Sequence, residues 1–176
     1  MDNKEYVKNK AVVAYDLLCQ GKYSRKARAV VLKDNRLLVI KINYNNGDIH
    51  YLLPGGTVDE GENTITTAVR ETLEEYGVIV KPIKYLGKQY YKMDMELDGK
   101  KFQSRVIDFY YICEYISTVD GGEFGIDGEF TKDDRKYQKT TLSIDELKKI
   151  SPSTLNDMDQ TNYDRLISYM ETQNKN

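Results

Sequence analysis

The stretch that decides the fold runs from Leu53 to Val78 and reads LPGGTVDEGENTITTAVRETLEEYGV. Its second half carries apolar residues at three- and four-residue steps, which predicts a helix from Asn63 to Tyr76 that ends at Gly77. At about 100° per residue, three glutamates fall on the face opposite the apolar one. These are Glu71, Glu74 and Glu75, and their spacing of three and four residues lets their side chains meet.

This arrangement of acids is unfavourable for the helix by itself. Neighbouring Glu side chains three or four positions apart cost about 0.2–0.5 kcal/mol per pair. Glu74 and Glu75 also lie in the last turn, where the helix dipole is negative. A solvated acidic face is the simplest interpretation of such a helix. A bound divalent cation would explain the cost better, because Mg²⁺ and Mn²⁺ are hard ions that take carboxylate oxygens.

A glycine loop precedes the helix. Pro54, Gly55 and Gly56 let the backbone approach the helix closely, and Gly56 can adopt conformations closed to other residues. The whole segment resembles the Nudix box, G-x5-E-x7-R-E-U-x-E-E-x-G-U, where U is a bulky aliphatic residue. Thr72 departs from the pattern at the first U, on the apolar side of the helix, where we expect a packing cost. The matching residues are Gly56, Glu62, Arg70, Glu71, Glu74, Glu75, Gly77 and Val78.

Outside the box the resemblance is weaker and covers roughly residues 27–150. It implies an α/β (α+β) fold, an α/β/α sandwich with a mixed sheet in which the box is a loop–helix–loop. We therefore expect a Nudix domain over 27–150, an N-terminal helical extension over 1–26 and a C-terminal helical segment over 151–176. Three further runs resemble the family's first hairpin, a later core strand and the segment before its closing helix: Arg28–Lys41, Arg105–Tyr115 and Thr140–Leu147.

The resemblance also implies a metal site. Glu71, Glu74 and Glu75 would be catalytic ligands of Mg²⁺ or Mn²⁺, and the Gly56 carbonyl would be a further ligand. The reaction would be attack of a metal-activated water on the diphosphate bond of a nucleoside diphosphate linked to another moiety. A metal-dependent pyrophosphohydrolase is therefore the predicted enzyme class.

Other residues receive supporting roles. Arg70 and Glu62 would hold the box loop on the helix. We also expect Arg70, Gly55 and Lys41 to contact the substrate, with a solvated lysine as the alternative for Lys41.

A carboxylate must complete the deprotonation of the attacking water. In the family this base lies within the box or on a later loop. The stretch from Gly121 to Tyr137, which we expect to be a long loop, offers Glu123 and Glu129. We favour Glu123 because it follows Gly121-Gly122, and Glu71 is the candidate if the base lies in the box. A solvated acid is the alternative for both loop residues.

Periodicity and turn residues predict the remaining elements. A helix over residues 3–20 should end near Gly21, a capping box at Ser143 and Glu146 should open a helix through Lys149, and a final helix should span Asp159–Met170. The expected strands are Ala29–Leu32, Leu37–Ile42, Ile49–Leu53, Val78–Val80, Tyr85–Tyr91 and Val106–Tyr115.

Composition limits the remaining function classes. The 26 basic and 28 acidic residues give a net charge of −2, which argues against a nucleic-acid partner. Long apolar runs and a signal-peptide pattern are absent from the sequence, so we expect no membrane partner and a cytoplasmic location. Cys19, Cys113 and His50 are too few for a Cys/His zinc site. We expect a small-molecule nucleotide as substrate, and a homodimer stays open.

Two other functions compete with hydrolysis. The fold also serves in nucleotide sensors that do not catalyse, although a sensor has no need of three glutamate ligands. The superfamily also contains isomerases of isoprenoid diphosphates, which would need a catalytic cysteine in the pocket. The substrate itself stays open among nucleoside triphosphates, ADP-ribose and other sugar nucleotides.

Overall fold

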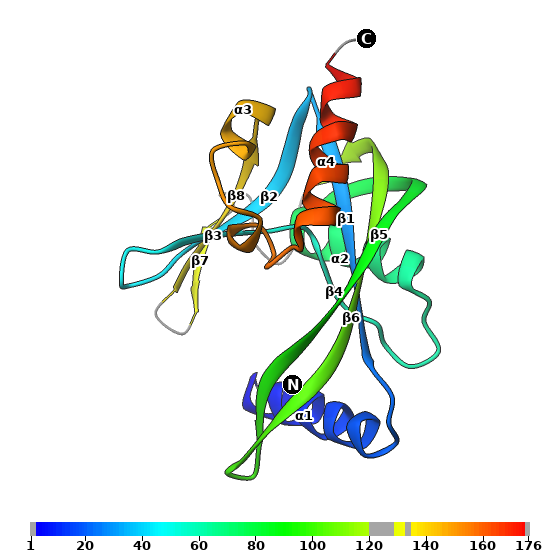
Figure 1. The fold of residues 1–176 in the computed structure, drawn as a ribbon, viewed down its shortest axis with the longest axis vertical. Coiled ribbons are helices and arrows are strands. Elements are labelled where there is room, and N and C mark those ends of the chain that lie inside the picture. The colour runs from blue at the N-terminus through cyan, green and yellow to red at the C-terminus, as the bar shows by residue number, and fades with distance from the viewer. Residues whose placement is uncertain (1–2, 120–128, 133–134, 175–176) are drawn as a thin grey trace.

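The structure is a computed structural model that describes residues 3–119, 129–132 and 135–174 (Figure 1). Its helices are α1 (Asn3–Cys19), α2 (Thr64–Tyr76), α3 (Ile144–Leu147) and α4 (Gln160–Gln173), with a short 3₁₀ turn, η1, at Pro152–Thr154. Its strands are β1 (Ser24–Lys33), β2 (Arg36–Asn43), β3 (Ile49–Leu52), β4 (Gly55–Thr57), β5 (Val78–Leu97), β6 (Lys100–Thr118), β7 (Glu129–Lys132) and β8 (Arg135–Leu142).

The described strands form one mixed sheet. Its order is β5-β6-β1-β2-β8-β7, with β3 paired to β2 and β4 paired to β1. The pairing of β1 with β6 is parallel, whereas β1–β2, β5–β6 and β2–β8 are antiparallel. The expected mixed sheet is therefore confirmed.

Each face of the sheet carries its own apolar core. On one face, Val30 and Val39 pack with Leu166 and Met170 of α4. On the other face, the neighbouring residues of the same strands pack against Ala68 of α2. Since successive side chains of a strand point to opposite faces, β1 and β2 supply both cores. Helix α4 thus covers one face and α2 the other, which confirms the α/β/α sandwich (Figure 1).

Helix α2 forms where the sequence predicts it. The Asn63 side chain accepts hydrogen bonds from the N–H groups of Ile65 and Thr66, and Gly77 ends the helix in the left-handed region at φ 67°. Thr72 is fully buried, and its hydroxyl donates to the Ala68 carbonyl at 2.6 Å. This bond satisfies the polar group that the pattern would replace with an aliphatic side chain.

The hairpin of β5 and β6 is much longer than predicted. Val78–Val80 and Tyr85–Tyr91 belong to one strand, and that strand and β6 continue to a tight turn at Asp98-Gly99. Both turn residues have positive φ, 48° and 80°, as the two-residue hairpin turn requires. The prediction missed this Asp-Gly signal because the polar ends of the two strands lack buried apolar residues.

The prediction of one long loop from Gly121 to Tyr137 is wrong for its second part. Strands β7 and β8 lie there, and Arg135 begins the strand that pairs with β2. The pairing of β8 with β2 satisfies the backbone of a segment whose own sequence is polar, so strand pairing overrides composition. The preceding part, including Glu123, lies outside the described residues.

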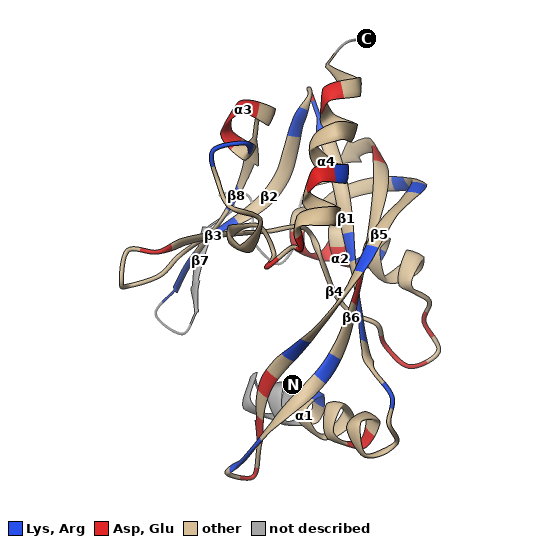
Figure 2. Cartoon of the chain, in the orientation of Figure 1, with Lys and Arg blue, Asp and Glu red and all other residues tan. Residues whose placement is uncertain are grey.

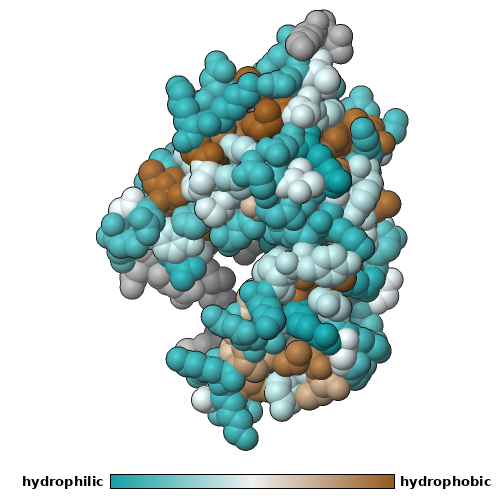
Figure 3. Space-filling view, viewed as in Figure 1, coloured by the Kyte–Doolittle hydropathy of each residue, from teal (hydrophilic) through white to brown (hydrophobic). Residues whose placement is uncertain are grey.

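The terminal helices both contact the sheet. Helix α1 packs on β5 and β6. The rings of Tyr15 and Phe102 meet edge-on there, with their centroids 5.3 Å apart. Of the α1 side chains from residue 9 onward, Ala11 and Ala14 are buried, whereas Val13 is 57% exposed. The surface over this view is largely hydrophilic, with apolar patches near both helices (Figure 3). The domain boundaries at residues 26 and 151 stay predictions.

Candidate metal centre and active site

Two glycines bring the box loop against its helix. Gly55 and Gly56 lie in β4 and pair with Arg28 and Ala27 of β1. Gly55 has φ 145°, and a Cβ there would lie 2.1 Å from the Ala27 carbonyl oxygen. A Cβ on Gly56 would lie 2.3 Å from Oε1 of Glu71. Gly55 therefore needs glycine, because its φ is positive and its Cβ would meet backbone. Gly56 does not have the positive φ that the sequence suggested, and a Cβ there would displace only the carboxylate of Glu71.

The carboxylates of Glu71 and Glu75 flank this glycine backbone. Glu75 accepts a hydrogen bond from the Gly55 N–H at 2.9 Å. The Glu71 side chain is 17% exposed, and its burial raises its pKa above the ordinary value, although the Arg70 charge opposes the shift. A cation would offset the same desolvation, so Glu71 has the environment of a ligand more than that of a solvated acid.

Arg70 organises the acids around it. Its guanidinium donates to both oxygens of Glu62, at 3.1 and 3.0 Å. It also lies 3.1 Å from Glu71, 2.8 Å from Glu74 and 3.3 Å from Asp59. The hydrogen bonds from Arg70 lower the pKa of Glu62 to about 2. The expected contact between Arg70 and Glu62 is present, whereas a substrate contact of Arg70 stays a prediction.

The three box glutamates do not converge on one point. Among the described residues, no three His, Cys, Asp or Glu side chains are placed to hold one metal ion. Glu74 is 53% exposed and pairs with Arg70, while Glu71 and Glu75 lie beside Gly55 and Gly56. The donors are hard oxygens of the kind that Mg²⁺ and Mn²⁺ take, so the residues fit such an ion. A site with all three ligands requires Glu74 to leave Arg70.

The remaining predicted site residues are not brought to the box by the described structure. Lys41 in β2 has the strand parity of Leu37 and Val39, so its side chain belongs to the α4 face and not to the α2 face. Glu123 lies outside the described residues, and of Glu129 only the backbone pairing with Gln138 is described. Substrate contact by Lys41 and Gly55 and the base assignment therefore stay predictions.

A buried ion pair beside the loop was not predicted from the sequence. Nε of Arg28 lies 3.2 Å from Oδ2 of Asp108, and Nη1 donates to the Gly55 carbonyl at 2.7 Å. Burial opposes the charge on Arg28, but Asp108 and then Glu75 raise its pKa above the ordinary value. A signal did exist, because Arg28 directly precedes the apolar run Ala29–Leu32 and Asp108 stands between Ile107 and Phe109.

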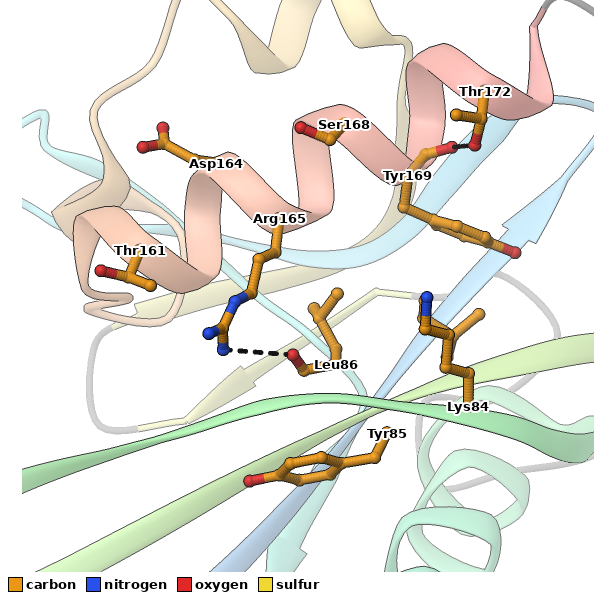
Figure 4. A pocket seen from close by; sticks show the side chains of 10 residues that line it. Lys84, Tyr85, Leu86, Thr161, Asp164, Arg165, Ser168, Tyr169 and Thr172 are labelled. Carbon is orange, nitrogen blue, oxygen red and sulfur yellow. Dashed lines mark hydrogen bonds between the residues drawn. The ribbon is translucent and has the colours of Figure 1, made fainter.

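One cavity lies away from the box. It has a volume of about 710 Å³ and opens between α4 and β5. Figure 4 shows Lys84 and Arg165 at this cavity, with Arg165 donating to the Leu86 carbonyl at 3.3 Å. No box residue is among those that line it. This cavity is therefore separate from the candidate metal centre.

Comparison with known proteins decides the family. A family model for the NUDIX domain matches residues 22–156. The chain belongs to the Nudix family. The match confirms the resemblance that the box predicts and also covers β1 to β8 and η1. Among the described residues, no helix combines the length and the apolar character needed to cross a membrane.

The individual Nudix proteins that resemble the chain share only part of its length or have low sequence identity. The chain is 36% identical over 94 residues to an ADP-ribose pyrophosphatase of Methanocaldococcus jannaschii, a stretch that is 53% of this chain and 50% of that protein. The chain thus spans about half the length of this relative. A NUDIX hydrolase from Nitrosomonas europaea has a TM-score of 0.57 and 19% identity, over 86% of this chain and 90% of that one.

A second solved structure gives the same result. A MutT NUDIX hydrolase from Burkholderia pseudomallei has a TM-score of 0.53 and 18% identity, and the match covers 82% of this chain and 96% of that chain. At these identities, the likeness to both structures shows the fold alone.

Proposed function

We propose that this Nudix protein is a Mg²⁺- or Mn²⁺-dependent hydrolase that cleaves the diphosphate bond of a nucleoside diphosphate linked to another moiety. The observation that carries the proposal is the contact of Glu71 and Glu75 with the Gly55-Gly56 backbone. It gathers two carboxylates beside one stretch of backbone, and Glu75 lies in the last turn of α2, where an acid weakens the helix unless a cation binds it. Family membership supports the same chemistry.

Each residue of the site has a distinct task in this mechanism. Glu71, Glu74, Glu75 and the Gly56 carbonyl would hold the metal. When bound, the ion neutralises the diphosphate and lowers the pKa of a water. Arg70 holds the box loop to α2 through Glu62, and Arg28 fixes the Gly55 carbonyl from the opposite side. The protein thus supplies a fixed backbone frame around acids that a cation can draw together.

The base that takes the proton from water has two candidates. Glu123 is the loop candidate that the sequence favours. Glu71 is the candidate within the box, because its carboxylate lies beside the Gly56 backbone at the proposed metal site. The choice between them is open to direct test.

ADP-ribose is the first substrate to test. The relative from Methanocaldococcus jannaschii is named an ADP-ribose pyrophosphatase, and its matching stretch includes half of its length. ADP-ribose also belongs to the chemical class that the site fits, two phosphates between a nucleoside and a second sugar. Its hydrolysis would yield AMP and ribose 5-phosphate.

An isoprenoid isomerase is a weaker candidate. Such an enzyme needs a reactive cysteine, but the Cys113 thiol is buried and contacts the Tyr111 carbonyl at 3.7 Å. Burial raises the pKa of this thiol to about 12, so it is not ionised at neutral pH. Cys19 is exposed at the end of α1. Neither environment favours cysteine catalysis.

The decisive experiment is hydrolysis of a panel of nucleotide diphosphate derivatives with product analysis. We expect turnover of one sugar nucleotide with Mg²⁺ or Mn²⁺, loss of turnover with a chelator, and recovery when the ion is restored. Binding of a nucleotide without turnover at any metal concentration would support the nucleotide sensor and overturn the hydrolase.

A further inference from the structure

An asparagine from the C-terminal segment holds the backbone between β3 and β4. Leu53 follows the last residue of β3 and is fully buried, so its N–H needs an acceptor inside the protein. The Oδ1 atom of Asn156 accepts that hydrogen bond at 3.1 Å, although 103 positions separate the two residues in the chain. Leu53 directly precedes Pro54-Gly55-Gly56, and the Gly56 carbonyl is a proposed metal ligand.

The other end of the Asn156 side chain contacts the buried ion pair. Its Nδ2 atom donates to Oδ2 of Asp108 at 3.4 Å, and the same oxygen lies 3.2 Å from Nε of Arg28. Arg28 in turn donates to the Gly55 carbonyl at 2.7 Å. Asn156 and Arg28 thus hold the chain on both sides of Pro54, and both are bonded to Asp108.

The turn that carries Asn156 is fixed to β3. The φ of Asn156 is 57°, in the left-handed region, where asparagine is tolerated better than most residues. Its N–H donates to the Tyr51 carbonyl at 2.8 Å. Leu155, directly before it, is fully buried and forms a parallel bridge with Tyr51. These contacts place the Asn156 side chain beside the N–H of Leu53.

The same turn is also fixed to β5. Gln89, a buried residue of β5, donates to the Asp157 carbonyl at 3.3 Å and accepts from the Asp159 N–H at 2.8 Å. The Asp159 side chain caps α4 by accepting from the N–H of Asn162. Figure 2 shows acidic residues in this turn, at the lower end of α4. Because the turn is bonded to both strands, Asn156 has a fixed position relative to the sheet.

We propose that Asn156 is a positioning residue that fixes the box loop to the C-terminal segment. We call Asn156, Asp108 and Arg28 the loop clamp. The loop clamp holds the N–H of Leu53 and the carbonyl of Gly55. Its effect on turnover rests on the proposed function, whereas the clamp itself does not. The segment from η1 to α4 then helps to build the site, although its residues lie outside the box.

Asn156→Gly tests the loop clamp, because glycine accepts the left-handed backbone and the change removes only the side chain. Amide hydrogen exchange of the metal-free protein, followed by NMR, is the first measurement. The N–H groups of Leu53 and Gly55 should exchange slowly in the wild type. In the variant, their exchange should accelerate about tenfold more than that of the β6 amides, which report unfolding of the whole chain.

Asp157→Gly is the matched control for exchange. Asp157 is the next residue, with a φ of 47° and an exposed side chain, so the same substitution removes a side chain outside the loop clamp. The exchange of Leu53 and Gly55 should then stay at the wild-type rate.

Kinetics measure the effect on the site. With a hydrolysed nucleotide and saturating Mn²⁺, Asn156→Gly should lower kcat about tenfold with a smaller change in KM, because the backbone beside the metal ligands is misplaced. Met170→Ala is the control for stability, since Met170 is buried in the α4 core and lies outside the loop clamp. It should lower the melting temperature at least as much and keep most of kcat at a temperature where both variants are folded.

The outcomes separate the loop clamp from the proposed function. Fast exchange of the Leu53 N–H in the wild type would overturn the clamp, even if Asn156→Gly fails to fold. Equal acceleration in β6 and the box loop would also contradict it, because Asn156 would then support only global stability.

The kinetic outcomes are equally distinct. If exchange rises in the box loop but the wild type hydrolyses no nucleotide, the proposed function fails and the loop clamp stands. If the wild type is active and Asn156→Gly keeps its kcat, or Met170→Ala loses as much, the positioning role of Asn156 fails alone.

Discussion

The backbone N–H of Gly55 donates a hydrogen bond to Oε2 of Glu75, 2.9 Å away. The same residue offers its carbonyl to Arg28 at 2.7 Å, so Gly55 is held from both sides. One bond ties the box loop to the last turn of α2, and the other ties it to the buried pair of Arg28 and Asp108. The position of the box backbone therefore depends on residues inside and outside the box.

Replacing Glu75 with Gln should abolish most turnover while the fold stays intact. The amide oxygen can still accept the bond from Gly55, but it carries no charge for a metal. Loss of a ligand worth several kcal/mol corresponds to a fall in kcat of about 10²-fold or more. Without metal the melting temperature should stay level or rise, because the change removes a charge from the negative helix end.

Steady-state kinetics and thermal melting check this prediction. Glu60→Gln is the matched control, because Glu60 lies exposed in the same loop and should lose no activity. Near-full activity in Glu75→Gln would show that Glu75 is not a metal ligand.

Metal ions should stabilise the protein. An ion that binds the native glutamates at a hundred times its Kd adds about 2.7 kcal/mol to the free energy of unfolding. For a chain of this size, that corresponds to a rise of several degrees in melting temperature. Scanning calorimetry with and without millimolar Mn²⁺ or Mg²⁺ measures the shift, and Glu71→Gln should reduce it. A melting temperature that ignores both ions in the wild type would speak against a metal centre.

The sequence predicts the helix of the Nudix box, but not the contacts from other strands that hold the box in place. Local signals were sufficient for α2, whose cap residue Asn63 and stop residue Gly77 act within a few positions. The pair of Arg28 and Asp108 is separated by 80 residues and forms only because β1 and β6 are parallel neighbours. Likewise, strand β8 depends on pairing with β2, which its polar sequence does not reveal. Contacts made by sheet topology are the part that sequence reasoning missed.

Arg28 should matter for both stability and turnover. Arg28→Met leaves Asp108 buried without its cation, which costs about 3–5 kcal/mol of unfolding free energy. Adding Asp108→Leu should recover part of that loss, because both charges are then gone. Since Arg28 also holds the Gly55 carbonyl, kcat should stay low in the double variant even where stability returns.

A double-mutant cycle in denaturant unfolding, together with kcat and KM of each variant, tests this arrangement. Strictly additive losses of stability would contradict the ion pair. Full recovery of kcat in the double variant would contradict the positioning role of Arg28.

The catalytic base is tested by a pair of substitutions in the segment after β6. If Glu123 is the base, Glu123→Gln should lower kcat by about 10²–10⁴-fold with little change in metal affinity. Glu129→Gln serves as the comparison within the same segment. If both variants keep the wild-type kcat, the base lies in the box, and Glu71 becomes the candidate.

The pair of Glu62 and Arg70 should make stability depend on pH. The pKa of Glu62 is about 2 in the folded protein, below its ordinary value of 4.5, chiefly because Arg70 donates hydrogen bonds to the carboxylate. Because the pKa of Glu62 is lower in the folded than in the unfolded protein, its carboxylate stabilises the fold at pH values above the unfolded pKa. This stabilisation is lost as the pH falls toward the folded pKa. Glu62→Gln should therefore reduce the free energy of unfolding at pH 6 and 7, and the difference from wild type should shrink between about pH 4.5 and 2.

Denaturant titrations of both proteins across this range measure the difference directly. The exposed Glu60→Gln serves again as the control, and its difference from wild type should be small throughout. The size of the Glu62 effect should also fall in Arg70→Met, since the donor that depresses the pKa is then absent. A Glu62→Gln deficit that stays constant down to pH 2 would mean that the carboxylate acts through its shape and its bond to Thr67, at 2.7 Å, and not through its charge.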